Sequence, residues 1–193
     1  MAMSDIGYYF PNPTYISILK EHRTGTWNTA VTNPEHAHEN HHGVFYIEHG
    51  TKPDNATYSY VILPGQSPCE TEAYAKNPNI EIIENSPSAH GVIERENHLT
   101  CINFGNDSPY TVANITADTK CCVILKNHEN RLELAISDPT NTNSKIVLQL
   151  DNKAKNIIAA DANIEVLSLS PLTIQFNCAH YEGESAHIIV ETL

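Results

Sequence analysis

The stretch Glu48-His-Gly-Thr-Lys-Pro-Asp-Asn-Ala-Thr-Tyr-Ser-Tyr-Val-Ile-Leu-Pro-Gly65 decides the fold that the sequence predicts. Residues 57–63 are rich in β-branched and aromatic side chains on both alternating faces, which predicts a strand buried on both sides. Residues 44–49 predict an earlier strand, and the glycine, proline and asparagine between the two runs predict a turn. Two strands joined by a short polar loop favour antiparallel pairing.

Short strand-like runs separated by turn residues recur along the chain at the roughly 8-to-12-residue spacing of an all-β sandwich. The predicted fold class is therefore all-β, with one or more antiparallel β-sandwiches. Residues 23–27 are predicted as a turn that enters a possible strand, and residues 33–43 as a polar loop. Further strands are expected at residues 15–19, 80–84, 90–94, 98–104, 111–117, 121–126, 131–137, 145–150, 164–168, 172–176 and 187–190.

One short helix is predicted near residues 68–76. Ser67 is a good N-cap, Pro68 suits the first helical position, and Glu70 completes a capping box with Ser67. The helix should end before the Asn77-Pro78 pair, because the residue before a proline disfavours helical geometry. We place a domain boundary here, which divides the chain into residues 1–78 and 79–193.

The charge of the chain limits its partners. The 193 residues include 23 acidic and 11 basic side chains, for a net charge of −12. A surface this acidic does not favour nucleic acid as a partner. The sequence has no apolar run long enough to cross a membrane, and its first residues have no signal-peptide pattern. The five cysteines are too scattered for a disulfide framework, and no CxxC pair predicts a zinc site.

Eight sequence segments, in one order and spacing, resemble polysaccharide lyase family 8, which contains the hyaluronate, chondroitin AC and xanthan lyases. The resemblance covers most of residues 5–150, and residues 151–193 add only a general β pattern. The segments are Asp5-Ile-Gly-Tyr-Tyr-Phe-Pro11, Arg23-Thr-Gly-Thr-Trp27, His49-Gly50, Tyr58-Ser-Tyr-Val-Ile-Leu-Pro-Gly65, Thr71-Glu-Ala-Tyr-Ala75, Asn77-Pro78, Ile80-Glu-Ile-Ile-Glu-Asn-Ser86 and Leu134-Ala-Ile-Ser-Asp-Pro-Thr140.

The resemblance implies a place for this chain within a larger enzyme. Members of the family have an N-terminal helical toroid that carries the catalytic residues, a central β-sandwich and a small C-terminal β-sandwich. Residues 1–78 then correspond to the closing strands of the central sandwich, and residues 79–193 to the C-terminal sandwich. The toroid has no counterpart in these residues, so no catalytic, cofactor-binding or metal-binding residue is carried over.

The same resemblance implies an extracellular enzyme that cleaves an anionic polysaccharide by β-elimination, with this portion as a non-catalytic support. The expected partners are the helical toroid and, in the full-length enzyme, the polysaccharide. Self-association is also expected, because strands cut from a larger sandwich expose their edges. Two other functions remain open: a stand-alone carbohydrate-binding module, and a purely structural β-domain.

Three groups of side chains are weighed as sites. His49 with Tyr58 and Tyr60 contains acid–base groups suited to β-elimination, but tyrosines at alternate strand positions are typical of packing. Arg23 and Arg95 are two of only three arginines in the chain, which is a poor supply of groups to hold an anionic sugar. An aromatic platform for a sugar ring is the third hypothesis, and it would be formed by Tyr8, Tyr9, Phe10 and Trp27.

A histidine-rich segment is the sharpest local feature of the sequence. It contains His36, His38, His41 and His42. Imidazoles at this density suit zinc, nickel or copper, but the segment does not match the spacing of a cupin site. We interpret it as a solvated loop whose histidines titrate between about pH 5 and 8. Metal binding by this segment is an alternative that the sequence leaves open.

Overall fold

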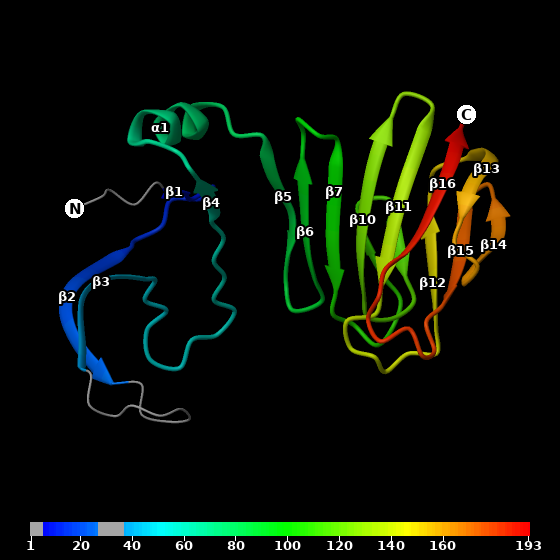
Figure 1. Ribbon diagram of the computed structural model, residues 1–193. Coiled ribbons are helices and arrows are strands. Elements are labelled where there is room, and N and C mark those ends of the chain that lie inside the picture. Colours follow the sequence, from blue (N-terminus) through cyan, green and yellow to red (C-terminus); the bar gives the residue numbers. More distant parts are fainter. Residues whose placement is uncertain (1–5, 27–36) are drawn as a thin grey trace. The chain divides into compact units, whose positions relative to one another are not determined.

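The computed structural model describes residues 6–26 and 37–193 (Figure 1). The chain divides into two compact units, Met1–Ala75 and Lys76–Leu193, which we call the N-terminal and C-terminal units. In the described residues nearly all regular structure is antiparallel β-sheet, with α1 as the single helix. The predicted fold class, all-β with a short helix near residues 68–76, is confirmed.

The C-terminal unit is a β-sandwich of two sheets. The seven-stranded sheet has the order β13-β16-β11-β10-β7-β6-β5, and the five-stranded sheet has the order β14-β15-β12-β9-β8. The strands are β5 (Ile80–Asn85), β6 (Ala89–Glu94), β7 (Leu99–Phe104), β8 (Tyr110–Val112), β9 (Ile115–Ala117), β10 (Cys121–His128), β11 (Arg131–Ser137), β12 (Lys145–Leu150), β13 (Ala154–Ala160), β14 (Ile164–Leu169), β15 (Leu172–Asn177) and β16 (Ala186–Thr192).

Strict alternation of side chains builds the core between these sheets. In β10 the buried residues are Cys121, Val123 and Leu125, and in β15 every second residue, ending at Phe176, is buried in the same way. A period of two places these side chains on one face of each strand, where they meet the opposite sheet. Full burial of each large aliphatic or aromatic side chain contributes about 1.5–3 kcal/mol, so this layer holds the unit together.

One buried carboxylate organises the loop between β11 and β12. Asp138 is 3% exposed, and it is the one buried charged residue in the described part of the chain. Its Oδ1 accepts hydrogen bonds from the Thr140 N–H at 2.9 Å and the Thr140 hydroxyl at 2.6 Å, and its Oδ2 accepts from the Asn143 N–H at 2.9 Å. Burial alone raises the pKa of Asp138, but these hydrogen bonds outweigh it and hold the pKa below its usual value.

Two details of the C-terminal unit differ from the sequence prediction. Residues 111–117 form a hairpin of β8 and β9 rather than one strand, because the chain turns at Ala113, whose φ is +52°. The strand β13 was not predicted at all. Its residues after Ala154 are exposed and show no alternation of burial, so the usual periodic signal is absent.

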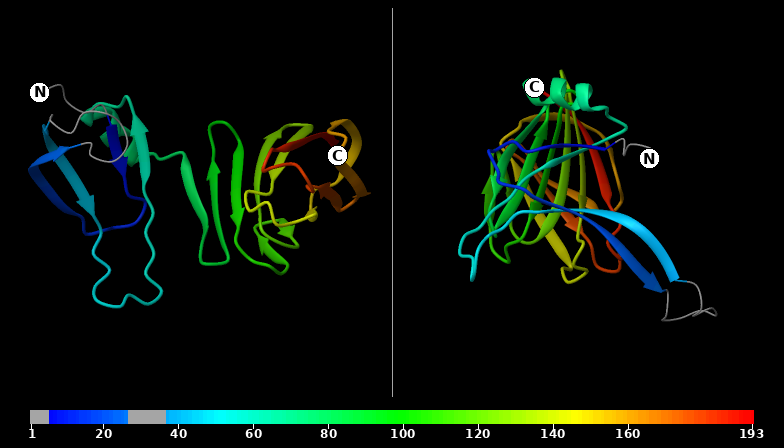
Figure 2. Two further views of the ribbon diagram at one scale, coloured as in Figure 1. Left: turned by 60° about the horizontal axis from the view of Figure 1, so that its bottom comes forward. Right: turned by 90° about the vertical axis from the view of Figure 1, so that its left-hand side faces the viewer.

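The N-terminal unit contains two separate two-stranded sheets and the helix. The strands β1 (Ile6–Tyr9) and β4 (Val61–Pro64) pair with each other, and β2 (Ser17–Thr26) pairs with β3 (Ala37–Tyr46) along their full length. Figure 2 shows β2 and β3 side by side as a two-stranded ribbon. In the described residues of this unit only Gly7 is buried, so neither sheet encloses a core.

The helix α1 (Pro68–Lys76) follows the sequence prediction in detail. The Ser67 N–H donates to Glu70 Oε2 at 2.8 Å, and the Glu70 N–H donates to Ser67 Oγ at 3.3 Å, which is a complete capping box. The side-chain hydrogen bond with Ser67 lowers the pKa of Glu70. Local hydrogen bonding therefore defines where this short helix begins.

The predicted strand pairing of the N-terminal unit is wrong. Residues 44–49 and 57–63 do not pair with each other, because β3 pairs with β2 and β4 with β1. Only residues 61–64 are in a strand, and Tyr58 and Tyr60 lie before it with exposed side chains. A strand buried on both sides needs a covering layer on each side of its sheet, and the described residues of this unit provide none.

The predicted turn at residues 23–27 and the predicted loop at 33–43 are also corrected within the described residues. Arg23–Thr26 is the end of β2, and residues 37–43 are the first part of β3. Polar side chains are tolerated along this ribbon because both of its faces are open in the described structure. The polar composition of these residues therefore did not indicate a loop.

The hydrogen bonds of Asp138 give a test of the C-terminal unit. In Asp138→Asn one acceptor oxygen becomes an N–H₂ donor facing N–H donors, so we expect the free energy of unfolding to fall by about 1–3 kcal/mol near pH 7. Because the pKa is lowered in the folded state, this stabilisation is present above the unfolded pKa of about 3.9 and is lost as the pH falls through the folded value. Urea unfolding from pH 3 to pH 7 measures both effects. A difference between parent and variant that does not change with pH would contradict the role of the ionised carboxylate.

An aromatic groove as the candidate functional site

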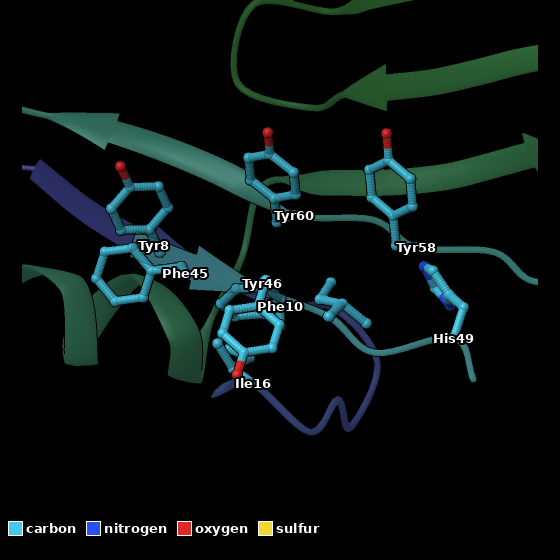
Figure 3. A pocket seen from close by; sticks show the side chains of 9 residues that line it. Tyr8, Phe10, Ile16, Phe45, Tyr46, His49, Tyr58 and Tyr60 are labelled. Carbon is cyan, nitrogen blue, oxygen red and sulfur yellow. The ribbon is translucent and has the colours of Figure 1, made fainter. Parts of the chain in front are cut away.

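The N-terminal unit contains a groove of about 370 Å³ lined mainly by aromatic side chains (Figure 3). Pockets for small molecules are typically apolar and aromatic, with a few polar groups that orient the ligand. The residues that line this groove are Tyr8, Phe10, Ile16, Phe45, Tyr46, Ile47, His49, Tyr58 and Tyr60. They come from β1, β3 and the segments that lead into β2 and β4, so the groove depends on residues far apart in the sequence.

Alternation along β1 explains how two of these rings reach the groove. Tyr8 and Phe10 face it, whereas Tyr9 faces the helix and packs against Tyr74, with ring centroids 5.5 Å apart. Gly7 lies on the helix side as well, where an added Cβ would overlap the side chain of Thr71. The absence of a side chain at Gly7 therefore lets α1 approach the strand that carries Tyr8.

Three tyrosine rings form a row along the groove. The centroids of Tyr58 and Tyr60 are 6.3 Å apart with ring planes within 18° of each other, and Tyr8 lies 6.4 Å from Tyr60. In Figure 3 the hydroxyl groups of the three tyrosines point to the same side. Tyr58 is 61% exposed and Tyr60 is 46% exposed, so this row is an accessible surface with an apolar body and a polar rim.

His49 extends this row, and its ring centroid lies 6.1 Å from that of Tyr58. The structure thus brings together His49, Tyr58 and Tyr60, the set weighed from the sequence. β-Elimination also needs a group that neutralises the uronate carboxylate, and among the described residues no lysine, arginine, asparagine or glutamine lines the groove. Arg23 pairs instead with Glu21, and Arg95 pairs with Glu81 at 2.6 Å.

The aromatic platform weighed from the sequence is present only in part. Tyr8 and Phe10 line the groove, Tyr9 faces the helix, and Trp27 lies outside the described residues. The sequence did not predict the contribution of Phe45, whose ring centroid is 5.3 Å from that of Tyr8. No local signal could have identified it, because this contact joins β1 to the end of β3.

The histidine-rich segment is only partly described. His36 lies outside the described residues, and the side chain of His38 is not described, whereas His41 and His42 are neighbours in β3 and face opposite ways. In residues 6–26 and 37–193 no group of three or more histidine, cysteine or acidic side chains is placed so that it could hold a metal ion. In the same residues no helix is long and apolar enough to cross a membrane.

Comparison with known proteins identifies the class of protein that this fold represents. The family model "Polysaccharide lyase family 8, super-sandwich domain" matches residues 1–75, and "Polysaccharide lyase family 8, C-terminal beta-sandwich domain" matches residues 81–147. The chain belongs to polysaccharide lyase family 8 and corresponds to the C-terminal portion of its members.

Individual relatives agree with this assignment. A xanthan lyase of Bacillus sp. strain GL1 is 37% identical over 191 residues, which cover 95% of this chain and 20% of that protein. The hyaluronate lyase HylB of Enterococcus faecalis is 27% identical over 97% of this chain and 19% of its own length. The chain therefore spans about a fifth of the length of these curated relatives.

Solved structures show the same fold. The Paenibacillus xanthan lyase superimposes with a TM-score of 0.88 and 32% identity, over 97% of this chain and 19% of that one. A chondroitin AC lyase of Streptomyces coelicolor gives a TM-score of 0.81 at 21% identity, over 95% of this chain and 25% of that one. At this lower identity, the similarity to the chondroitin AC lyase shows only that the two proteins share a fold.

The close approach of Gly7 to Thr71 predicts that Gly7→Ala separates α1 from β1. The added methyl group must displace the Thr71 side chain, and overpacking of this kind costs about 1–3 kcal/mol. We expect faster amide hydrogen exchange in α1, and a smaller increase in Gly7→Ala/Thr71→Ala, where the overlapping atoms are removed. Gly43→Ala is the control, because nothing lies within 4 Å of a Cβ added there. Equal exchange in Gly7→Ala and the control would contradict this role.

Proposed function

We propose that this chain is the non-catalytic β-sandwich portion of a polysaccharide lyase whose complete form cleaves an anionic polysaccharide by β-elimination. Support comes from the two family models, which name a super-sandwich and a C-terminal sandwich, and from relatives named for xanthan, hyaluronate and chondroitin. The small share of each relative that this chain covers supports a role as part of a larger enzyme.

The exposed apolar surface of the N-terminal unit is the observation that carries this proposal. The C-terminal unit buries most of its apolar side chains between two sheets, but in the described N-terminal unit most large apolar side chains are exposed. They are Ile6, Tyr8, Tyr15, Ile18, Leu19, Phe45, Tyr46, Tyr58, Tyr60 and Ile62. A patch of this kind on a soluble protein is typical of an interface.

We assign a different role to each part of the chain on the basis of this contrast. Residues 1–78 provide the closing strands of the central sandwich, and the preceding strands of the same enzyme cover their apolar face. Residues 79–193 form the small C-terminal sandwich, and a helical toroid carries the catalytic groups. For the chain by itself, self-association through the same face and the open strand edges is part of the proposal. An extracellular location is proposed for the complete enzyme by analogy with its family.

A lyase assay on the isolated chain tests this function. The chain should form no unsaturated uronate from hyaluronan, chondroitin sulfate or xanthan, because among the described residues no lysine, arginine, asparagine or glutamine lines the groove to bind the substrate carboxylate. Ultraviolet absorbance of the new double bond measures the product, and a complete family 8 lyase serves as the positive control. Product formed by the chain alone, and lost in His49→Ala or Tyr58→Ala, would make the groove an active site and overturn the proposal.

Carbohydrate binding is the second candidate function, and the row of tyrosines favours it. Nearly parallel rings with hydroxyl groups on one side suit the apolar face and the polar edge of a sugar. If the groove binds a sugar, Tyr60 should contribute to the binding, because it lines the groove. Tyr15 is the control, because its side chain is exposed but does not line the groove.

Calorimetric titration with anionic and neutral oligosaccharides separates the two functions. If the apolar face is an internal interface, we expect no saturable binding to the parent chain. Binding that Tyr60→Ala weakens at least tenfold and Tyr15→Ala leaves unchanged would instead assign the groove to a sugar. The same titration of the complete enzyme with these two variants shows whether the groove stays accessible there.

A further inference from the structure

The outer faces of the two sheets in the C-terminal unit differ in polarity. On the five-stranded sheet one row of directly paired residues is polar throughout, and it consists of Thr111, Thr116, Gln149 and Thr173. On the seven-stranded sheet a row that crosses five strands, from β5 to β11, is apolar. We call it the apolar row, and it consists of Ile82, Val92, Cys101, Ile124 and Ala135.

The apolar row faces away from the core. In β10 the core residues are Val123 and its alternate neighbours, so Ile124 points outward, and it is 48% exposed. The other four residues of the row are partly exposed. Ile80, Leu99 and Ile189 extend the apolar surface in the next row of the sheet. An apolar sheet face of this kind on a soluble protein is typical of an interface.

The rows on either side of the apolar row make this face complementary to itself. One flanking row contains three charged residues, which are Glu94, Lys126 and Glu133. The other flanking row has no acidic residue, lysine or arginine, and it consists of Asn85, His90, Asn103, Cys122 and Ser137. A two-fold axis along the apolar row would set each flanking row against the opposite flanking row of a second copy. No charged side chain would then meet a like charge.

The size of the face limits the strength of such a contact. Five strands spaced about 4.8 Å apart and three rows spaced about 7 Å apart cover roughly 500 Å² on each copy. Stable specific complexes typically bury about 800 Å² on each partner, and transient complexes bury less. The contact should therefore be weak and reversible.

We propose that two copies of this chain associate through the outer faces of their seven-stranded sheets, with the apolar rows in contact about a two-fold axis. Packing of Ile124 and its neighbours against the second copy removes apolar surface from water, as packing of the two sheets does on the inner side. The contact is separate from self-association through the N-terminal unit, and it is independent of the proposed lyase role.

Sedimentation velocity of the chain over a wide range of concentration tests the contact. We expect a reversible equilibrium of monomer and dimer, with dimerisation at least tenfold weaker in Ile124→Glu. Ile157→Glu is the matched control, because Ile157 is 46% exposed in β13 and lies outside the apolar row. The proposal is overturned by a chain that stays monomeric, or by a dimer that Ile124→Glu weakens no more than Ile157→Glu does.

Alkylation of the cysteines locates the interface. Cys101 lies in the apolar row, whereas Cys69 is exposed in α1 of the N-terminal unit. A higher chain concentration should slow the reaction of Cys101 with excess iodoacetamide but not that of Cys69, and Ile124→Glu should remove this protection. Protection of Cys69 without protection of Cys101 would assign the dimer to the N-terminal unit and overturn the proposal.

A charge placed at residue 137 tests the two-fold arrangement. Ser137 and Glu133 lie in opposite flanking rows of β11, so the axis would bring Ser137 of one copy to Glu133 of the other. Ser137→Lys should therefore strengthen dimerisation and Ser137→Glu should weaken it, and both effects should shrink at high salt. A change of the same sign in both variants, or no change in either, would contradict this arrangement.

Discussion

Each apolar face of a sheet must be covered by a second layer that excludes water, and the rest of the structure depends on this requirement. In the C-terminal unit the two sheets meet this need for each other, and alternating side chains such as Val123 in β10 and Ile174 in β15 are fully buried between them. In the described N-terminal unit the rings of Phe45, Tyr58 and Tyr60 remain exposed. Within residues 6–26 and 37–193 the chain therefore contains a closed sandwich and a set of strands without a covering layer.

This contrast connects the fold to the proposed function. The C-terminal unit encloses its own core, whereas the aromatic groove lies on strands that have none, and the comparisons place both units in the C-terminal portion of family 8 lyases. In the described residues no lysine or arginine lines the groove, so its aromatic lining is better suited to packing than to neutralising a uronate. These observations support the proposal that the apolar face is an interface within a larger enzyme.

The sequence predicted elements whose signals are local and missed those set by distant contacts. Ser67 and Glu70 predicted where α1 begins, because their hydrogen bonds lie within four residues of chain. The alternating strands of the C-terminal sandwich were also predicted, but exposed β13 was missed, and the residues around Ala113 lacked a clear turn signal. Pairing in the N-terminal unit failed because adjacency in sequence was taken for adjacency in space.

For the candidate sites, too, the sequence predicted local features and missed contacts between distant residues. Tyr8, Phe10 and the set of His49, Tyr58 and Tyr60 were recognised from sequence because they lie in short aromatic runs. Their common groove required the fold, since Phe45 reaches Tyr8 only through tertiary structure. The pairing of β2 with β3 was hidden by the prediction of a loop at residues 33–43, because a loop has no partner strand.

The most direct test of a missing layer compares amide hydrogen exchange in the 193-residue chain alone and in the same chain joined to the preceding portion of a family 8 lyase. The account predicts equal protection of the C-terminal strands in both proteins. At concentrations at which the chain alone is monomeric, it predicts protection of β1 and β4 only in the longer protein. Equal protection of β1 and β4 in both proteins would show that the N-terminal unit is complete by itself and would contradict the account.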